Sequence, residues 1–164
     1  MRNVLLIVYY FPPSVDAGAK RAEGFARHLP EFGYQPTVLT VKDGNYLTVP
    51  ETALNDQADV VRVAERRWPA RLRSGTAAVC HGLPHRDGRV LRAIKRGFRE
   101  IFYVPDAFCG FYRPACQGAL GIMRRRPMDL IFTTSGPYTL LRVGHSLSRR
   151  TGIPWVADFR DLWV

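Results

Sequence analysis

The feature that most constrains the fold is an unbroken apolar run near the start of the chain, Asn3 to Tyr10 (NVLLIVYY). Apolar residues at consecutive rather than alternate positions are typical of a parallel strand that is covered on both faces. Pro12 and Pro13 close the run well short of the ~20 apolar residues that a membrane-spanning helix needs. We therefore expect a buried strand in the middle of a sheet.

The next thirty residues complete a crossover unit. A turn-rich loop is followed by a helix expected from about Ala17 to Phe32, and its apolar residues recur at helical spacing on one face: Ala22, Phe25, Ala26 and Leu29. Gly33 stands where a helix C-cap glycine belongs, and Pro36–Val41 reads as a second strand. Strand, helix and strand in this order predict a right-handed crossover between parallel strands.

The rest of the chain repeats the alternation. Further strands are expected at Val60–Ala64, Met128–Thr134 and Pro154–Phe159. Helices are expected at Arg89–Phe102, Arg113–Arg125 and Pro137–Thr151, whereas residues 42–59 and 74–88 read as irregular. This pattern predicts an α/β domain with about five parallel strands and helices on both faces. With the first strand central, the strand order is 3-2-1-4-5.

The predicted topology also locates a binding site. Ligands of such sheets bind at the carboxyl ends of the strands, where the winding direction reverses. That point lies between the first and fourth strands. Three unusual loops leave carboxyl ends there, at residues 11–18, 134–137 and 159–163. We expect them to converge, with Pro13 shaping the first loop and Ser135 and Gly136 lining the cleft.

The first loop has too few glycines for a dinucleotide site. A GxGxxG turn needs three, and only Gly18 lies in the loop. A helix N-terminus with one permissive glycine can still hold a phosphate or a sugar hydroxyl through backbone N–H groups. Asp16 capping the helix is the simpler interpretation, and the two are compatible.

Basic residues follow directly in the first turn of this helix. Lys20 and Arg21 oppose the helix dipole there, at a cost of ~0.3–1 kcal/mol each. A cation accepted at a predicted cleft favours an anionic ligand, and Arg21 is the stronger candidate, while Lys20 fits a solvated surface charge equally well.

Charged residues also end the last strand. Asp158, Arg160 and Asp161 place three charges within four positions. They serve either the cleft or a local arginine–carboxylate pair that orders the loop.

The charge balance indicates an anionic partner, since the net charge is +10. The expected helix Arg89–Phe102 has an apolar face and a basic one, and its basic residues are Arg92, Lys95, Arg96 and Arg99. Such helices bind anionic membrane surfaces, or simply present a solvated charged face. Arg124, Arg125 and Arg126 suit the C-terminus of a helix. No aromatic platform accompanies these residues, which argues against nucleic acid.

The cysteines indicate no special chemistry. Cys80, Cys109 and Cys116 are odd in number and lack CxxC spacing, so neither a disulfide framework nor a zinc site is expected. Free thiols in a reducing cytosol are the plain interpretation. The sequence implies no metal and no Ser-His-Asp or Cys-His arrangement.

Two segments together resemble a known family. VYYFPPSVDAGAKRAEGFARHLPEFGYQPTVLTV is similar to the opening of the family 4 glycosyltransferases of GT-B fold. YVPDAFCGFYRPA and DLIFTTSGPYTLLRVGHSLSRRTGIPWVADFRDLW look like the rest of that N-terminal, Rossmann-like domain. The resemblance covers nearly the whole chain and is weakest from Asp43 to Gly88.

The resemblance implies retaining transfer of a sugar from a nucleotide-diphosphate donor to a glycan or lipid-linked acceptor at the cytoplasmic membrane face. Gly18 matches the glycine of the loop near the donor phosphates. Asp161 matches an aspartate that follows a histidine in many members, and Arg160 replaces that histidine. A guanidinium binds anions but is a poor proton acceptor, so Arg160 and Asp161 would orient substrates.

The resemblance also bounds the domain. Nothing in the chain matches the family's Glu-x7-Glu region or its donor-phosphate Arg and Lys. Residues 1–164 are therefore expected to form the acceptor-side domain without the C-terminal donor-binding domain, and to be inactive alone. The alternative is a non-catalytic truncated remnant or a partner-binding Rossmann-like module.

Overall fold

The structure is a computed structural model that describes residues 1–42, 59–66, 106 and 108–159. The helix expected at Arg89–Phe102 lies outside these residues, and so do Arg160 and Asp161.

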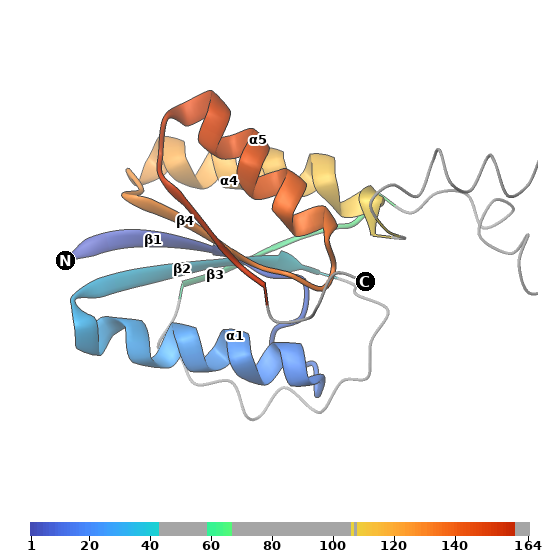
Figure 1. Ribbon diagram of the computed structural model, residues 1–164, viewed down its shortest axis with the longest axis horizontal. Coiled ribbons are helices and arrows are strands. Elements are labelled where there is room, and N and C mark those ends of the chain that lie inside the picture. The colour runs from blue at the N-terminus through green and yellow to red at the C-terminus, as the bar shows by residue number, and fades with distance from the viewer. Residues whose placement is uncertain (43–58, 67–105, 107, 160–164) are drawn as a thin grey trace, which may run out of the picture.

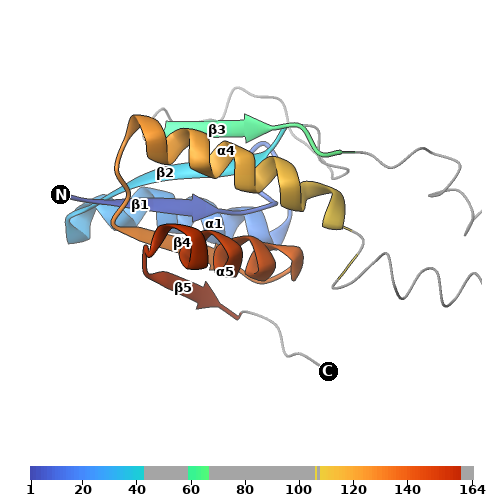
Figure 2. The same cartoon turned by 90° about the horizontal axis from the view of Figure 1, so that it is seen from above.

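A single sheet forms the centre of the molecule. Its strands are β1 (Arg2–Ile7), β2 (Tyr34–Val41), β3 (Asp59–Val63), β4 (Leu130–Thr134) and β5 (Trp155–Asp158). All four strand pairings are parallel and the order is β3-β2-β1-β4-β5 (Figure 2). The predicted five-stranded α/β topology is confirmed, with β1 in the middle.

Helices cover both faces of this sheet. They are α1 (Ala17–His28), α4 (Tyr112–Arg125) and α5 (Thr139–Thr151), with short 3₁₀ turns at Leu29–Phe32 and Cys109–Phe111. Figure 1 shows α1 beneath the sheet and α4 and α5 together above it. The three-layer arrangement follows from the crossover rule, because the chain turns to the other face when it moves from one half of the sheet to the other.

Each face of the sheet buries its own core. On the α1 side, Val4, Leu6 and Val8 of the central strand segment pack with Ala22 and Ala26. On the other side, Leu5, Ile7 and Tyr9 pack with residues of α4 and α5. Successive side chains of a strand point to opposite faces, so a central strand covered twice must be apolar throughout. This requirement explains the run that opens the chain.

The first helix is shorter than the sequence predicts. The expected end at Phe32 is wrong, because α1 stops at His28 and a 3₁₀ turn follows. Pro30 has no backbone N–H and cannot continue the α-helical bonding pattern. Gly33 then takes a φ of 81°, where it caps the turn as expected.

The capping role expected for Asp16 is also wrong. Asp16 occupies the N-cap position, but its side chain makes no capping hydrogen bond. Its carboxylate instead accepts a hydrogen bond from Ser14 Oγ at 2.5 Å.

Among the described residues, no helix has the length and apolar content to cross a membrane.

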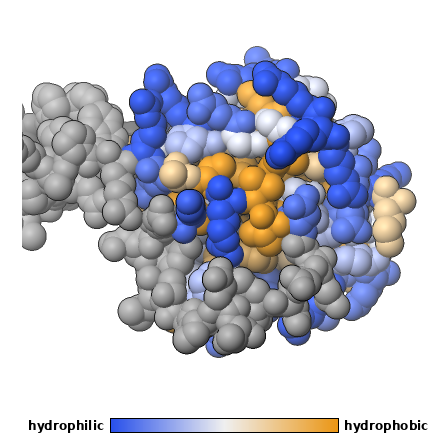
Figure 3. All heavy atoms as spheres, turned by 180° about the vertical axis from the view of Figure 1, so that it is seen from behind, coloured by the Kyte–Doolittle hydropathy of each residue, from blue (hydrophilic) through white to orange (hydrophobic). Residues whose placement is uncertain are grey.

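On the β3 side, the valines Val60, Val61 and Val63 are only partly buried. Figure 3, which views the molecule from behind, shows hydrophobic residues exposed there between hydrophilic ones.

Candidate functional site at the carboxyl edge of the sheet

The carboxyl edge carries a row of polar side chains on the α1 side. The strand register aligns Arg62 with Thr40 and Thr134 with Asp158, and Val8 stands between the two pairs. Parallel neighbours in register point to the same face. The strands β3, β2, β4 and β5 therefore each place one polar side chain in a line along this edge. The line passes the point where the chain leaves β1 toward α1 and leaves β4 toward α5, on opposite faces of the sheet.

Two of these residues hold the first loop in place. Arg62 donates a hydrogen bond to the Pro12 carbonyl at 2.6 Å, and Thr40 Oγ1 donates to the Tyr9 carbonyl at 2.9 Å. The Pro12–Pro13 peptide bond is cis, as is Gly136–Pro137 in the loop after β4. The start of the loop that leads into α1 is thus held by hydrogen bonds at Tyr9 and at Pro12.

The N-terminus of α1 has no side-chain capping hydrogen bond, although Asp16 stands at its N-cap position. Its first turn contains no acidic residue, and no side chain caps it. Gly18 is buried in this first turn. The backbone N–H groups at a helix N-terminus carry partial positive charge and bind anions. This end of α1 is therefore available to an anion from outside the described chain.

By contrast, the side chain of Asp106 caps the N-terminus of α5. Asp106 Oδ2 accepts a hydrogen bond from the Thr139 backbone N–H at 2.8 Å, and Oδ1 accepts from Thr139 Oγ1 at 2.6 Å. Phe108 N–H also donates to Oδ1, at 2.9 Å. Asp106 thus caps α5 from thirty-three positions away in the sequence, which a local capping pattern would not reveal.

Arg21 and Asp158 form a two-point ion pair across the α1 side. Arg21 Nε and Nη2 donate to the two carboxylate oxygens of Asp158, each at 2.8 Å. The guanidinium carbon also lies 5.3 Å from the Phe25 ring centroid. The hydrogen bonds that Arg21 donates to Asp158 raise the pKa of Arg21 above its ordinary value. This pair joins the first turns of α1 to the end of β5.

Thr134 supplies an unsatisfied group at this edge. Its hydroxyl and that of Thr37 are the buried side-chain polar atoms of the described residues that lack a hydrogen-bond partner. Leaving a buried hydroxyl unpaired costs about 1–3 kcal/mol. Thr134 aligns with Asp158 at the carboxyl end of β4, and its hydroxyl is buried there.

Aromatic residues and a carboxylate occupy the other side of the same edge. Tyr9 packs edge-to-face against Phe108 and Phe111, with ring centroids 4.7 and 5.4 Å away. Its hydroxyl donates to Glu65 Oε2 at 2.9 Å. Tyr10 stands beside Tyr9 and Phe108. Tyr9 and Phe111 are buried, so this group belongs to the hydrophobic core beneath the edge.

Neither described cysteine acts as a thiolate here. Cys109 and Cys116 are free, as expected. Burial raises the pKa of both thiols above their ordinary value, and the charge of Asp106 adds to this effect at Cys109. Both therefore stay protonated at neutral pH and are weak nucleophiles.

The structure brings several predicted residues together. The Ser135 backbone N–H donates to the Asp158 carbonyl at 2.7 Å, and Arg21 reaches the same residue from α1. Pro13 and Gly136 lie in the two loops that leave β1 and β4.

The sequence interpretation missed Arg62, Thr134, Glu65 and Asp106. The available signal for Thr134, Glu65 and Asp106 was their position at or just beyond the end of a predicted strand or turn, whereas Arg62 lies within the predicted strand Val60–Ala64.

Comparison with known proteins identifies the class of domain. No protein-family model matches the sequence, and no curated protein sequence matches it. MurG from Acinetobacter baumannii, a GT-B glycosyltransferase, aligns with a TM-score of 0.51 and 14% identity over 96% of this chain and 34% of MurG. The fold that the two chains share is a Rossmann-like α/β domain.

A second solved structure has the same fold and a different description. It is the C-terminal domain of a hydrogenase from Pyrococcus furiosus, with a TM-score of 0.50 and 15% identity over 96% of this chain and 91% of that one. The chain spans about a third of MurG but nearly all of this domain. Identities this low establish the shared fold alone.

Proposed function

We propose that this chain is the N-terminal, acceptor-side domain of a retaining family 4 glycosyltransferase. Its carboxyl edge would position a glycan or lipid-linked acceptor beside the pyrophosphate of a nucleotide-diphosphate sugar. The donor-binding domain, with most of the donor contacts, would lie outside these 164 residues. The likeness of fold to MurG and the family resemblance of the two sequence segments support this assignment.

One observation carries the proposal. Three described helices, α1, α4 and α5, begin at this edge. Asp106 caps α5, whereas the Asp16 side chain at the N-cap of α1 makes no capping hydrogen bond. Backbone N–H groups without a side-chain cap suit a phosphate, and we propose that the first turn of α1 binds the phosphates of the donor.

The residues would act by binding and positioning. Gly18 lets the donor phosphates approach the backbone of α1, while Pro13, Ser135 and Gly136 shape the cleft walls. Arg21 and Asp158 hold α1 against β5, so that phosphate and acceptor meet in a fixed relation. Arg160 and Asp161, outside the described residues, would orient donor and acceptor. Electrostatic stabilisation without a protein nucleophile is the proposed mode of catalysis.

Location and partners complete the proposal. An acceptor carried on a lipid would place the domain at the cytoplasmic face of a membrane. The basic residues Arg92, Lys95, Arg96 and Arg99 are one proposed contact with that surface.

Nuclear magnetic resonance titration tests the site directly. Isotope-labelled protein is titrated with UDP-glucose, GDP-mannose and inorganic pyrophosphate. We expect the amide signals of Gly18, Ala19 and Ser135 to move with at least one nucleotide sugar. Signals that move only elsewhere, or not at all, would contradict the proposed site and favour a non-catalytic module.

A further inference from the structure

The strand β5 is the outermost strand on one side of the sheet. Among the described residues, no strand pairs with its outer side. Figure 2 shows β5 at the opposite end of the sheet from β3. An edge strand presents a row of backbone N–H and C=O groups that can pair with a further strand. The outer side of β5 is therefore a candidate docking surface, and we call it the β5 edge.

The hydrogen bonds to β4 show which residues of β5 face outward. The Pro154 and Asp158 carbonyls accept hydrogen bonds from backbone N–H groups of β4 and of the residue that follows it, at 2.9 and 2.7 Å. Residues along a strand direct their backbone groups alternately to the two sides. Val156 therefore bonds to β4 as well. The N–H and C=O groups of Trp155 and Ala157 face outward, where an added strand can bind them.

The middle of the β5 edge lacks the charged residues that usually protect an exposed strand. Native proteins guard such edges with charged side chains or proline, because bare edges recruit other strands. The opposite edge strand, β3, carries Asp59 and Arg62. In β5, the residues Trp155 to Ala157 are uncharged, and Val156 is 43% exposed. This contrast favours a partner strand at β5 rather than at β3.

The α1 side of the β5 edge offers an apolar surface. Val156 is in register with Phe132 of β4. The Phe132 ring packs against Phe25 of α1, with ring centroids 4.9 Å apart, and both rings are only partly buried. A strand beside β5 would place its own side chains next to Val156 on this side. Apolar residues at alternate positions of the partner therefore fit here.

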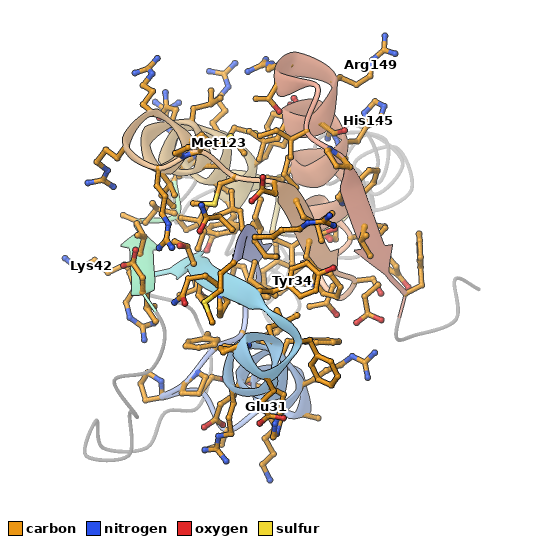
Figure 4. The ribbon with its side chains drawn as sticks, turned by 90° about the vertical axis from the view of Figure 1, so that its left-hand side faces the viewer. Glu31, Tyr34, Lys42, Met123, His145 and Arg149 are labelled. Carbon is orange, nitrogen blue, oxygen red and sulfur yellow. The ribbon has the colours of Figure 1, made fainter. Side chains whose placement is uncertain are left out.

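The α5 side of the β5 edge is basic. The His145 ring of α5 lies edge-on to Trp155, with ring centroids 6.2 Å apart, and α5 contains no acidic residue. Figure 4 shows His145 and Arg149 projecting from α5 on the β5 side of the molecule. On the α1 side, the charge of Asp158 is neutralised by its ion pair with Arg21. Charge complementarity therefore favours an acidic partner.

A second copy of this chain fits the β5 edge poorly. In a two-fold dimer the same surface meets itself, so the α5 helices of the two copies would face each other. Each α5 carries Arg142, His145, Arg149 and Arg150 without an acidic residue. Each chain also has a net charge of +10. Like charges would therefore meet across the two-fold axis, which costs binding energy.

We propose that the β5 edge binds an extended acidic segment of another polypeptide as an additional strand. The outward backbone groups of Trp155 and Ala157 supply the hydrogen bonds, Val156 supplies apolar contact, and the basic residues of α5 select acidic side chains. The segment that fits alternates apolar residues on the α1 side with acidic residues on the α5 side. The inference does not depend on the proposed function, because this surface lies beside the sheet and not at the carboxyl ends of its strands.

Hydrogen exchange of the unbound protein tests the state of the β5 edge. The amides of Trp155 and Ala157 should exchange much faster than those of Val156 and Asp158, which are bonded to β4. Protection of all four amides without a partner would overturn the proposal, because the edge would then already be covered.

Fluorescence anisotropy with labelled peptides tests the choice of partner. The full chain is titrated into the synthetic peptide Val-Glu-Val-Glu-Val-Glu-Val and into the same peptide with lysine in place of glutamate. The first test variant, Ala157→Pro, removes an outward N–H and leaves the bonds to β4 intact. The second, Val156→Glu, places an acidic side chain at an exposed position of the edge.

The control variant is Val60→Pro in the opposite edge strand. The Val63 carbonyl accepts a hydrogen bond from the Lys42 N–H beside β2, so the alternation places the Val60 N–H on the outer side of β3. The control thus removes an outward N–H from the other end of the sheet. Thermal unfolding checks that all three variants fold.

The expected results separate the alternatives. Wild-type protein and the Val60→Pro variant should bind the glutamate peptide equally, and at least about tenfold more tightly than the lysine peptide. Ala157→Pro and Val156→Glu should each weaken binding about tenfold. The amides of Trp155 and Ala157 should become protected in the complex.

Four outcomes would overturn the proposal. They are no binding of the glutamate peptide, a preference for the lysine peptide, unchanged binding by Ala157→Pro and Val156→Glu, and an equal loss in Val60→Pro. A dimer of the wild-type chain that Ala157→Pro dissociates, measured by analytical ultracentrifugation, would overturn it as well, because the β5 edge would then pair with itself.

Discussion

At the scale of single residues, some polar side chains at the carboxyl edge have hydrogen-bond partners and one does not. Asp106 accepts three hydrogen bonds, and Asp158 binds Arg21 at two points. Thr134, next to Asp158 in register, is buried without a partner. Natural proteins rarely leave buried polar atoms unpaired, so the Thr134 hydroxyl is a candidate hydrogen-bonding group of the site.

The two unpaired threonines give a matched test of that idea. Thr134→Val and Thr37→Val each remove a buried hydroxyl while keeping the branched shape. Each should raise the free energy of unfolding by about 1 kcal/mol, because an unsatisfied group is lost. Urea unfolding of each variant measures the change in the free energy of unfolding. Only Thr134→Val should weaken nucleotide-sugar binding, and an equal effect of Thr37→Val would contradict a ligand role for Thr134.

The Arg21–Asp158 pair predicts a measurable coupling. A double-mutant cycle with Arg21→Met and Asp158→Asn should give an interaction of about 1 kcal/mol, since the geometry is two-pronged but Arg21 is half exposed. The exposed pair of Arg27 and Glu23, at 3.5 Å, is the control and should couple by about 0.3–0.5 kcal/mol or less. Coupling in the first cycle no larger than in the control would show that the pair does not hold α1 to β5.

At the scale of elements, close packing of helices against the sheet depends on small residues. Gly144 of α5 lies directly on the sheet, and a Cβ there would come 2.6 Å from Trp155 Cε2 and 2.9 Å from Thr133 Cγ2. Trp155 Nε1 donates to Thr133 Oγ1 at 2.9 Å beneath it. The spacing between α5 and the β4–β5 pair is therefore set by the absence of a side chain.

Substitution of two helical glycines tests this packing. Gly144→Ala should lower the free energy of unfolding by about 1–3 kcal/mol, because the added methyl overpacks the Trp155 contact. Gly121→Ala on α4 meets nothing within 4 Å and should raise it by up to about 1 kcal/mol through helix propensity. Chemical denaturation of the two variants measures the change in the free energy of unfolding that each substitution causes. Similar effects of both substitutions would mean that α5 can shift freely on the sheet.

Capping by Asp106 predicts a local effect on α5. Asp106→Ala removes the acceptor of the Thr139 N–H and should cost about 1–2 kcal/mol of unfolding free energy. Asp106→Asn keeps one acceptor oxygen and should cost less. Hydrogen exchange should speed up first at the amides of Thr139 to Arg142. Asp59→Ala, at an exposed position at the start of β3, is the control and should leave those amides unchanged.

At the scale of the whole molecule, two hydrophobic cores share one sheet, and the candidate site lies at its carboxyl edge. β1 contributes residues to both cores. The two loops of the candidate site leave β1 and its neighbour β4, which are inner strands of the sheet and have a hydrogen-bonded strand on each side.

The two-domain proposal predicts that this chain has no transferase activity of its own. Purified protein incubated with labelled nucleotide sugars and glycan or lipid acceptors should give no labelled product, because the donor contacts are incomplete. Thin-layer chromatography of the products is the measurement. Robust turnover by this chain would refute the assignment to an acceptor-side domain.

The sequence by itself determined the topology. Consecutive apolar residues in β1 require cover on both faces, and the alternation of strand and helix patterns leaves few arrangements for five parallel strands. The predicted ends of elements were less accurate where one residue interrupts the helical pattern, as Pro30 does just after α1. The positions of Gly18, Ser135 and Asp158 at one edge follow from the strand order alone.

The tertiary structure decided which polar groups meet. Asp106 reaches Thr139 and Arg21 reaches Asp158 across long separations in the sequence, and no local pattern encodes either contact. The same holds for the unpaired Thr134 hydroxyl, because hydrogen-bond satisfaction depends on every neighbour in space. Periodicity records which face of an element is apolar, whereas the partner of each polar atom is fixed only when the elements pack together.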